Sequence, residues 1–251
     1  MTVPIPVLRF HSISDARAGD ALTVTRRQFE RHVATIAACG RRAVTISELA
    51  AGLRGLRPLP ELCVAITFDR GYLDTVAALE LLRAHDLSAT LFVAPGAVGH
   101  GDAIEAVQVR ELAGWDRVEL GAHTGSRPRL DALRTTVAGD EIRRCKHALE
   151  QLAGTRVDSF AYPHGAFDQR IRGLVIDAGF SSAAAVKNAL SHPRDDPFAI
   201  ARWTVRGATT TDDVAAVLNG TGAPRARSGE RVRTRALRVV RRAGGSLVRA
   251  A

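Results

Sequence analysis

The sequence alternates between short apolar runs and segments with helical periodicity, and this alternation restricts the folds open to the chain. The clearest run, Cys63–Phe68, is almost continuously apolar, as a parallel strand buried on both faces requires. It ends at Asp69, and the chain then turns through Arg70 and Gly71 into a helical pattern. Roughly seven such strands separated by helices predict parallel βαβ units that close into a barrel-like sheet.

The expected elements follow this pattern along the chain. The strands are expected at residues 7–11, 43–45, 63–68, 89–93, 118–121, 159–161 and 180–186. The helices are expected at residues 25–39, from an N-cap at Ser47, and at 74–84, 104–113, 137–152 and 168–178. Asp74 favours a helix N-terminus, where an acidic side chain complements the helix dipole, although it could also approach a site at the neighbouring strand end.

Polar side chains fall just past the ends of several expected strands. They are His11, Asp69, His123 and the segment Pro163-His164-Gly165. Because the carboxyl ends of parallel barrel strands meet at one edge, where barrel enzymes assemble their active sites, we expect these residues to share a pocket. A lone Asp after a strand is more often a helix cap, and a lone His is usually a structural hydrogen-bonding residue, so the coincidence of positions carries the prediction.

The 251 residues suit one α/β domain at 1–224 followed by a basic tail at 225–251. The tail holds nine arginines and one acid, a net charge of +8, which leaves about +1 for the preceding part. A basic amphipathic helix there could lie on an anionic membrane surface, and a mobile solvated tail is at least as probable. No nucleic-acid fold motif accompanies the tail, so we predict no nucleic-acid partner.

The remaining composition gives few constraints. The three cysteines, Cys39, Cys63 and Cys145, are widely spaced and indicate no disulfide framework. The N-terminus lacks the basic and apolar regions of a signal peptide, and no apolar run approaches the roughly 20 residues of a membrane span. These features favour a cytoplasmic protein.

Three motifs in order resemble those of the polysaccharide deacetylases, the family that includes the NodB chitooligosaccharide deacetylases. Thr67-Phe-Asp-Arg-Gly71 resembles the family's Thr-Phe-Asp-Asp-Gly, and Gly121-Ala-His-Thr-Gly-Ser-Arg-Pro-Arg-Leu130 resembles its Gly-Ser-His-Thr-x-x-His-Pro-x-Leu. Phe160-Ala-Tyr-Pro-His-Gly165 resembles its third motif. The resemblance spans about residues 5–205 and implies a distorted (β/α)7-type barrel of the NodB kind.

The resemblance also implies roles for single residues. Asp69 takes the place of the catalytic base, and the backbone N–H of His164 that of the oxyanion donor. Tyr162 and Pro163 would form one wall of the substrate groove. Leu8-Arg-Phe-His11 resembles the opening of circularly permuted members, in which His11 would be the general acid.

Two departures affect the metal site that the resemblance implies, which in the family holds zinc or another divalent ion. Arg70 replaces its aspartate and Arg127 replaces its second histidine, so His123 is the one remaining ligand. Arginine offers only donors and cannot be deprotonated in a protein, so neither replacement can bind a metal. The formal charges of Asp69, Arg70 and Arg127 sum to +1. We therefore expect no metal cofactor.

The replacements leave three interpretations open. In the first, Arg70 and Arg127 pair with Asp69 in place of the cation, and the protein hydrolyses the carbon–nitrogen amide bond of an N-acetylated sugar, free or carrier-linked, without metal. In the second, an inactive homologue binds a glycan or an anionic sugar, since paired arginines recognise carboxylate and phosphate. In the third, the arginines form a salt bridge that plugs an obsolete pocket.

Overall fold

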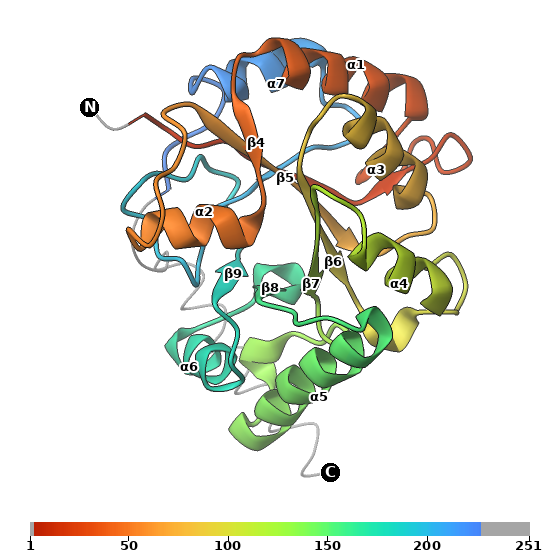
Figure 1. The fold of residues 1–251 in the computed structure, drawn as a ribbon, viewed down its shortest axis with the longest axis vertical. Helices are drawn as coiled ribbons and strands as arrows, with labels where there is room; N and C mark the ends of the chain where they lie inside the picture. The colour runs from red at the N-terminus through yellow and green to blue at the C-terminus, as the bar shows by residue number, and fades with distance from the viewer. Residues whose placement is uncertain (1–2, 227–251) are drawn as a thin grey trace, which may run out of the picture.

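A curled parallel sheet forms the centre of the protein, which we describe from a computed structural model for residues 3–226 (Figure 1). The tail beyond residue 226, for which we expected a basic helix or a mobile segment, lies outside the described residues. The strands of the sheet follow the order β10-β1-β5-β6-β7-β8-β9, and β4 pairs with the start of β5. They are β1 (Val7–Phe10), β4 (Arg42–Val44), β5 (Cys63–Arg70), β6 (Ala89–Val93), β7 (Val118–Ala122), β8 (Ser159–Ala161), β9 (Ser182–Ala184) and β10 (Trp203–Thr204).

One short segment joins the two edges of this sheet. Ile200 forms a parallel bridge to Ala184 at the end of β9, and its amide nitrogen lies 3.0 Å from the carbonyl oxygen of Ala183. Three residues later, β10 pairs in parallel with β1 at the other edge. Residues 200–204 therefore close the curled sheet into a distorted barrel, which confirms the fold expected from the sequence.

Seven helices of residues 3–226 surround the sheet. They are α1 (Arg26–Ala38), α2 (Ile46–Leu53), α3 (Thr75–Ala84), α4 (Ala106–Ala113), α5 (Thr135–Ala153), α6 (Gln169–Asp177) and α7 (Thr211–Leu218). The sequence analysis missed β10 and α7, although Thr210 and Asp213 form a capping box at the start of α7. No helix among the described residues is long and apolar enough to cross a membrane.

One expected N-cap is wrong. The N-cap of α2 is Thr45, whose side chain accepts a hydrogen bond from the Glu48 amide, because Thr45 and Glu48 satisfy the capping box that Ser47 cannot. The Ser47 amide and hydroxyl both donate to Glu119. Asp74 stands at the N-cap of α3, as expected, but its carboxylate makes no capping hydrogen bond because it accepts from Ser12 and from Arg17.

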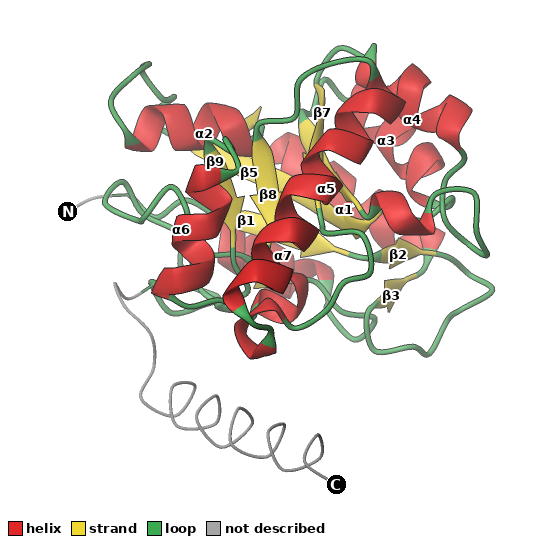
Figure 2. Ribbon diagram, turned by 90° about the horizontal axis from the view of Figure 1, so that it is seen from below, coloured by secondary structure: helices red, strands yellow, loops and turns green. Residues whose placement is uncertain are grey.

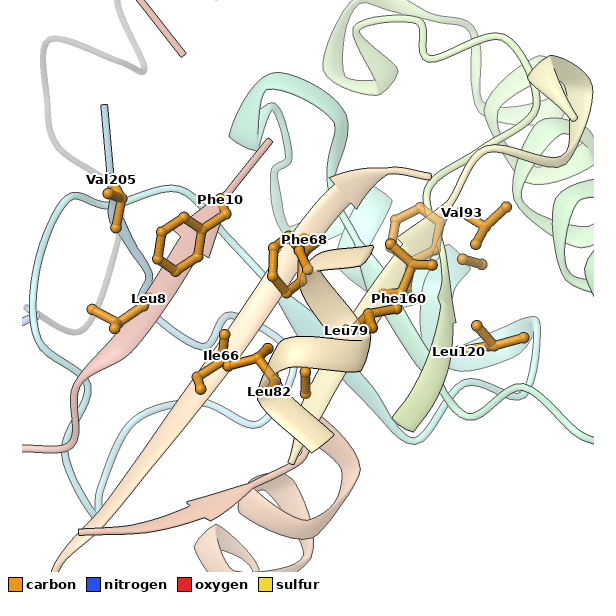
Figure 3. Packing of buried hydrophobic residues seen from close by; sticks show 14 of the residues in the cluster. Leu8, Phe10, Ile66, Phe68, Leu79, Leu82, Val93, Leu120, Phe160 and Val205 are labelled. Carbon is orange, nitrogen blue, oxygen red and sulfur yellow. The ribbon is translucent and has the colours of Figure 1, made fainter. Parts of the chain in front are cut away.

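Alternation along the strands separates apolar and polar side chains. Leu8 and Phe10 of β1 pack with Ile66 and Phe68 of β5 on the side covered by α3, as Figure 3 shows. Successive residues of a strand point to opposite faces, so Arg9, which pairs in register with Thr67, points into the barrel. The same alternation brings Asp69 to the interior.

The two ends of the barrel differ. Ile46 and Leu49 of α2 share a buried apolar cluster with Val7 and Ala65, which lie near the starts of β1 and β5. The small sheet of β2 (Ser12–Ile13) and β3 (Thr23–Val24) follows the carboxyl end of β1. Figure 2 shows α2 and this small sheet on opposite sides of the molecule. The side chains of α2 therefore cover the start of these two strands, and the strand-end residues expected to form a site lie at the carboxyl end.

Candidate functional site

A pocket of about 260 Å³ opens at the carboxyl edge of the barrel. Its walls come from the segment after β1, the ends of β5 and β7, and the turn after β8. The lining residues are Arg9, His11, Ser12, Asp20, Leu22, Thr23, Arg70, Tyr72, His123, Arg127, Pro163 and His164. The pocket brings together four of the strand-end residues that were expected to meet at one edge, His11, His123, Pro163 and His164, and Arg70 and Arg127 line it as well.

Asp69 lies beneath the pocket and is fully buried between two arginines. Its Oδ2 lies 2.6 Å from Nε of Arg9, and its Oδ1 lies 2.6 Å from Nη1 of Arg202. A third bond joins Arg202 Nη2 to Oδ2 at 3.2 Å. Burial opposes ionisation, but the Arg202 and Arg9 guanidinium groups hold the pKa of Asp69 well below its usual range. Asp69 is therefore a carboxylate with both oxygens engaged.

These two partners of Asp69 were not predicted. One interpretation paired Asp69 with Arg70 and Arg127, and this pairing is wrong because Arg9 and Arg202 occupy the carboxylate. Arg9 could have been found, since it stands two residues before His11 on a strand and must share its face. Arg202 lies in the short segment that closes the barrel. That segment resembles the family's late apolar-Pro-Arg segment, with Ala201 in place of the proline, but the likeness names no partner for the arginine.

His11 contacts the same cluster from the end of β1. Its Nε2 lies 2.5 Å from Nη2 of Arg9, and since guanidinium can only donate, Nε2 accepts and Nδ1 carries the proton. Nδ1 is buried and has no hydrogen-bond partner among residues 3–226. Burial lowers the pKa of His11 to about 3 in spite of the charge on Asp69. The ring is therefore neutral and holds an unused donor.

In His123 the donor and acceptor nitrogens are exchanged relative to His11. Its Nδ1 lies 3.0 Å from the carbonyl oxygen of Ala161, so Nδ1 donates and Nε2 keeps its lone pair. Burial lowers the pKa of His123 to about 4. His123 lines the pocket with His11, so one neutral imidazole offers a donor and the other an acceptor.

Arg70 and Arg127 stand at the pocket wall. Arg70 donates from Nη1 to the hydroxyl of Tyr72, and its guanidinium carbon lies 4.5 Å from the centre of that ring. The Arg127 amide donates to Thr124 Oγ1 at 3.0 Å, and its carbonyl accepts from Nε2 of His164 at 3.2 Å. In residues 3–226 neither guanidinium has a carboxylate within ion-pair distance, so the interpretation of a plugging salt bridge finds no support there.

Tyr162 does not take part in the pocket. Its ring is fully buried, stacks on Phe167 at 4.3 Å between centroids, and donates its hydroxyl to the Phe198 carbonyl at 2.9 Å. Burial raises the pKa of the phenol. The expected substrate contact of Tyr162 is therefore wrong, because the side chain packs in the core while its neighbour Pro163 faces the pocket.

The donor set does not fit the divalent metal that the resemblance implies. Among residues 3–226 no three His, Cys, Asp or Glu side chains are grouped so that they could hold an ion. Arg70 and Arg127 cannot act as ligands, and both oxygens of Asp69 are already bound by guanidinium groups. His123 alone cannot form a site that usually takes three protein ligands.

Comparison with known proteins places these residues in a family. The family model described as polysaccharide deacetylase matches residues 57–183, just over half of the chain. The Bacillus subtilis (strain 168) protein named "Putative polysaccharide deacetylase YxkH" is 27% identical over 166 residues, which are 66% of this chain and 58% of the relative. The matched part thus spans less than two thirds of that relative.

Solved structures show the same fold. The deacetylase PplD of Streptococcus pyogenes, solved in complex with acetate, superposes with a TM-score of 0.78 at 19% identity, covering 89% of this chain and all of that one. IcaB from Ammonifex degensii gives a TM-score of 0.74 at 22% identity, covering 88% and 97%. The family match includes Asp69, Arg70, His123 and Arg127 but not Arg9 or Arg202. The chain belongs to the polysaccharide deacetylase family.

Proposed function

We propose that the pocket binds an N-acetylated carbohydrate, free or carrier-linked, without hydrolysing it by the family's metal-dependent route. One observation carries this proposal: both oxygens of Asp69 are engaged by Arg9 and Arg202. A carboxylate in this state has neither a free lone pair aimed at a substrate nor the raised pKa that favours a general base near neutral pH. We therefore assign Asp69 a positioning role in place of the catalytic role expected from the resemblance.

The pair of neutral imidazoles supports the choice of ligand. An acetamido group offers one N–H donor and one carbonyl acceptor. His11 supplies an unpartnered Nδ1–H, and His123 supplies the lone pair of Nε2. The two side chains therefore hold the donor and the acceptor that complement both polar atoms of that group, and the His11 ring has to open its buried Nδ1 to the pocket when the ligand binds. The buried donor of His11 would gain the hydrogen bond that it otherwise lacks, which is the kind of precisely placed polar contact that fixes a ligand in a pocket.

Asp69 acts on the ligand through Arg9. The carboxylate holds Arg9 Nε, and Arg9 Nη2 in turn fixes the tautomer of His11 by donating to Nε2. Loss of the carboxylate would release this chain of contacts and leave Arg9 and Arg202 as buried like charges. Asp69 is thus needed for binding even though it does not touch the sugar.

The test combines a binding and a turnover measurement on the purified full chain. Isothermal titration calorimetry with N-acetylated chitooligosaccharides is expected to show binding that His123→Ala weakens about tenfold or more. Acetate release from the same oligosaccharides is expected to stay at the level of a no-protein blank, with or without added zinc. Acetate release that a chelator abolishes would overturn the proposal, as would the absence of binding to any of the oligosaccharides.

A second candidate function, metal-free hydrolysis, is favoured by the same imidazoles. In this reaction the Nε2 of His123 takes a proton from water as the oxygen attacks the acetamide carbon, and the backbone N–H of His164 stabilises the oxyanion. The carbon–nitrogen bond then breaks, and the amine leaves with the proton held by His123. Acetate release that resists a chelator and is lost in His123→Gln would select this candidate.

A further inference from the structure

Two arginines at the pocket lack an acidic partner. In the part of the chain that the structure describes, Arg70 and Arg127 both line the pocket, and no carboxylate lies within ion-pair distance of either. Burial and the nearby charge of Arg70 lower the pKa of Arg127. Two guanidinium groups that repel each other in a partly buried place indicate a missing negative charge.

The charge balance of the whole site points the same way. The lining and the buried cluster beneath it contain four arginines, Arg9, Arg70, Arg127 and Arg202, against the two aspartates Asp20 and Asp69, a net charge of +2. The imidazoles of His11 and His123 add nothing, because both are neutral near pH 7. Asp20 lies exposed at the rim, while Asp69 is already engaged below. The excess positive charge therefore comes from Arg70 and Arg127 on the pocket wall.

The Arg70 side chain is held in place before any ligand arrives. The ring of Tyr72 contacts two cations, with the guanidinium carbon of Arg70 4.5 Å and that of Arg17 4.6 Å from its centre. Arg17 is in turn fixed by Asp74 at 2.6 Å and by Asp102. A guanidinium that is already oriented loses less conformational entropy when it binds an oxyanion.

The backbone at both arginines is also unusual. Arg70 has a φ of 84° and Arg127 a φ of 55°, and the flanking Thr124 and His164 have φ of 57°. Residues other than glycine rarely adopt these values, and residues that do tend to cluster at ligand sites. Four of the seven such residues described in the chain therefore lie at or beside this pocket.

We propose that the carbohydrate bound in this pocket carries an anionic group, a carboxylate or a phosphate, that accepts hydrogen bonds from Arg70 and Arg127. This inference rests on the proposed function, since it names the class of sugar that the pocket takes. The shared chemistry is an oxyanion with at least two acceptor oxygens, which matches the fork of guanidinium donors.

The experiment compares sugars that differ only in the charged group. Calorimetry on the full chain uses N-acetylglucosamine, N-acetylglucosamine 1-phosphate and N-acetylglucosaminuronic acid. Either charged sugar is expected to bind at least tenfold more tightly than the neutral one, and the preferred sugar identifies phosphate or carboxylate as the source of the charge. Equal affinity for all three would overturn the inference while leaving the proposed function standing. Absence of binding to all three would overturn both.

Variants at matched backbone positions complete the test. Arg70→Asn and Arg127→Asn remove the guanidinium but keep a residue that tolerates positive φ, so the turns are expected to stay folded. Each is expected to cut the affinity for the charged sugar tenfold or more and to weaken binding of the neutral sugar far less, so that the preference for the charged sugar is lost. Arg117→Asn is the control, because Arg117 also has a positive φ, 67°, but lies before β7 at the opposite edge. An equal loss in Arg117→Asn, or no loss in the other two, would contradict the inference.

Discussion

Nε of Arg9 lies 2.6 Å from Oδ2 of Asp69, and this bond joins the ends of two neighbouring strands inside the barrel. Arg202 binds the other oxygen of the same carboxylate from the segment that closes the barrel. The side chain of Asp69 is only 1% exposed, so water cannot substitute for either partner. The three residues therefore form one buried charge cluster on which the geometry of the pocket depends.

Removing Arg202 is expected to destabilise the protein strongly. Arg202→Met keeps much of the side-chain volume but leaves part of a buried charge network uncompensated, and breaking a buried ion pair from one side costs about 3–5 kcal/mol. Urea unfolding followed by circular dichroism measures the change. Arg31→Met is the control, since Arg31 is exposed on α1 and its loss is expected to change stability by less than about 0.5 kcal/mol. A loss below about 1 kcal/mol in Arg202→Met would contradict the expected cost.

Stability is expected to fall as the pH drops from 7.5 to 5. The folded pKa values of His11 and His123, about 3 and about 4, lie below the unfolded value of about 6.5, so the unfolded chain takes up protons first. Each histidine then costs the folded state roughly 2 kcal/mol at pH 5. Asp69 stays ionised in both states over this range, because its folded pKa is lowered.

Urea unfolding at a series of pH values checks this expectation. In His123→Gln the slope of stability against pH between 7.5 and 5 is expected to be smaller than in the wild type. His147→Gln is the control, because His147 is exposed on α5 and is expected to leave the slope unchanged. The same slope in wild type and His123→Gln would show that His123 titrates alike in both states.

Zinc binding is expected to appear only when the two arginines are reverted. The double substitution Arg70→Asp with Arg127→His restores, beside His123, the carboxylate and imidazole donors that zinc prefers. Elemental analysis after dialysis against zinc is expected to find about one ion per chain in the double variant and well under one in the wild type. Arg117→Asp tests for unspecific uptake. Stoichiometric zinc in the wild type would show that our account of the donor set is wrong.

Gly96, which lies in the segment after β6, is expected to control the conformation of the turn that carries Arg127. A Cβ at Gly96 would lie 2.5 Å from the carbonyl oxygen of Gly125, a backbone atom that cannot rotate away. Gly96→Ala is therefore expected to displace the turn and weaken binding of the charged sugar several-fold in calorimetry. Gly173→Ala is the control, since nothing lies within 4 Å of its Cβ and alanine in α6 is expected to add about 0.5–1 kcal/mol of stability. Unchanged affinity in Gly96→Ala would show that the turn adapts.

The sequence predicts the barrel well because its strands and helices follow from local patterns of apolar residues and helix caps. The apolar runs of β5 and β6 and the capping box at Thr25 identify elements that the structure places at nearly the same residues. The strand-end positions of His11 and His123 likewise predict a shared pocket, which the structure confirms.

Side-chain pairing across the barrel was not predictable in the same way. Asp69 could pair with any arginine near the carboxyl edge, and sequence position favoured its neighbour Arg70. The positive φ of Arg70 and its contact with Tyr72 turn that side chain to the wall instead. Arg202 reaches the carboxylate because a two-residue strand, β10, closes the sheet, and so short a strand has no periodicity to read.

The closure of the barrel by residues 200–204 makes the pocket depend on contacts between distant parts of the chain. Asp69 and Arg202 are separated by 133 positions, and they meet only when the last strand docks beside the first. A fragment that ends at residue 183, where the family match ends, keeps the motif residues but lacks Arg202, one of the three residues of the charge cluster. Such a fragment would hold Asp69 without its second arginine, so the family motifs alone do not make up the pocket.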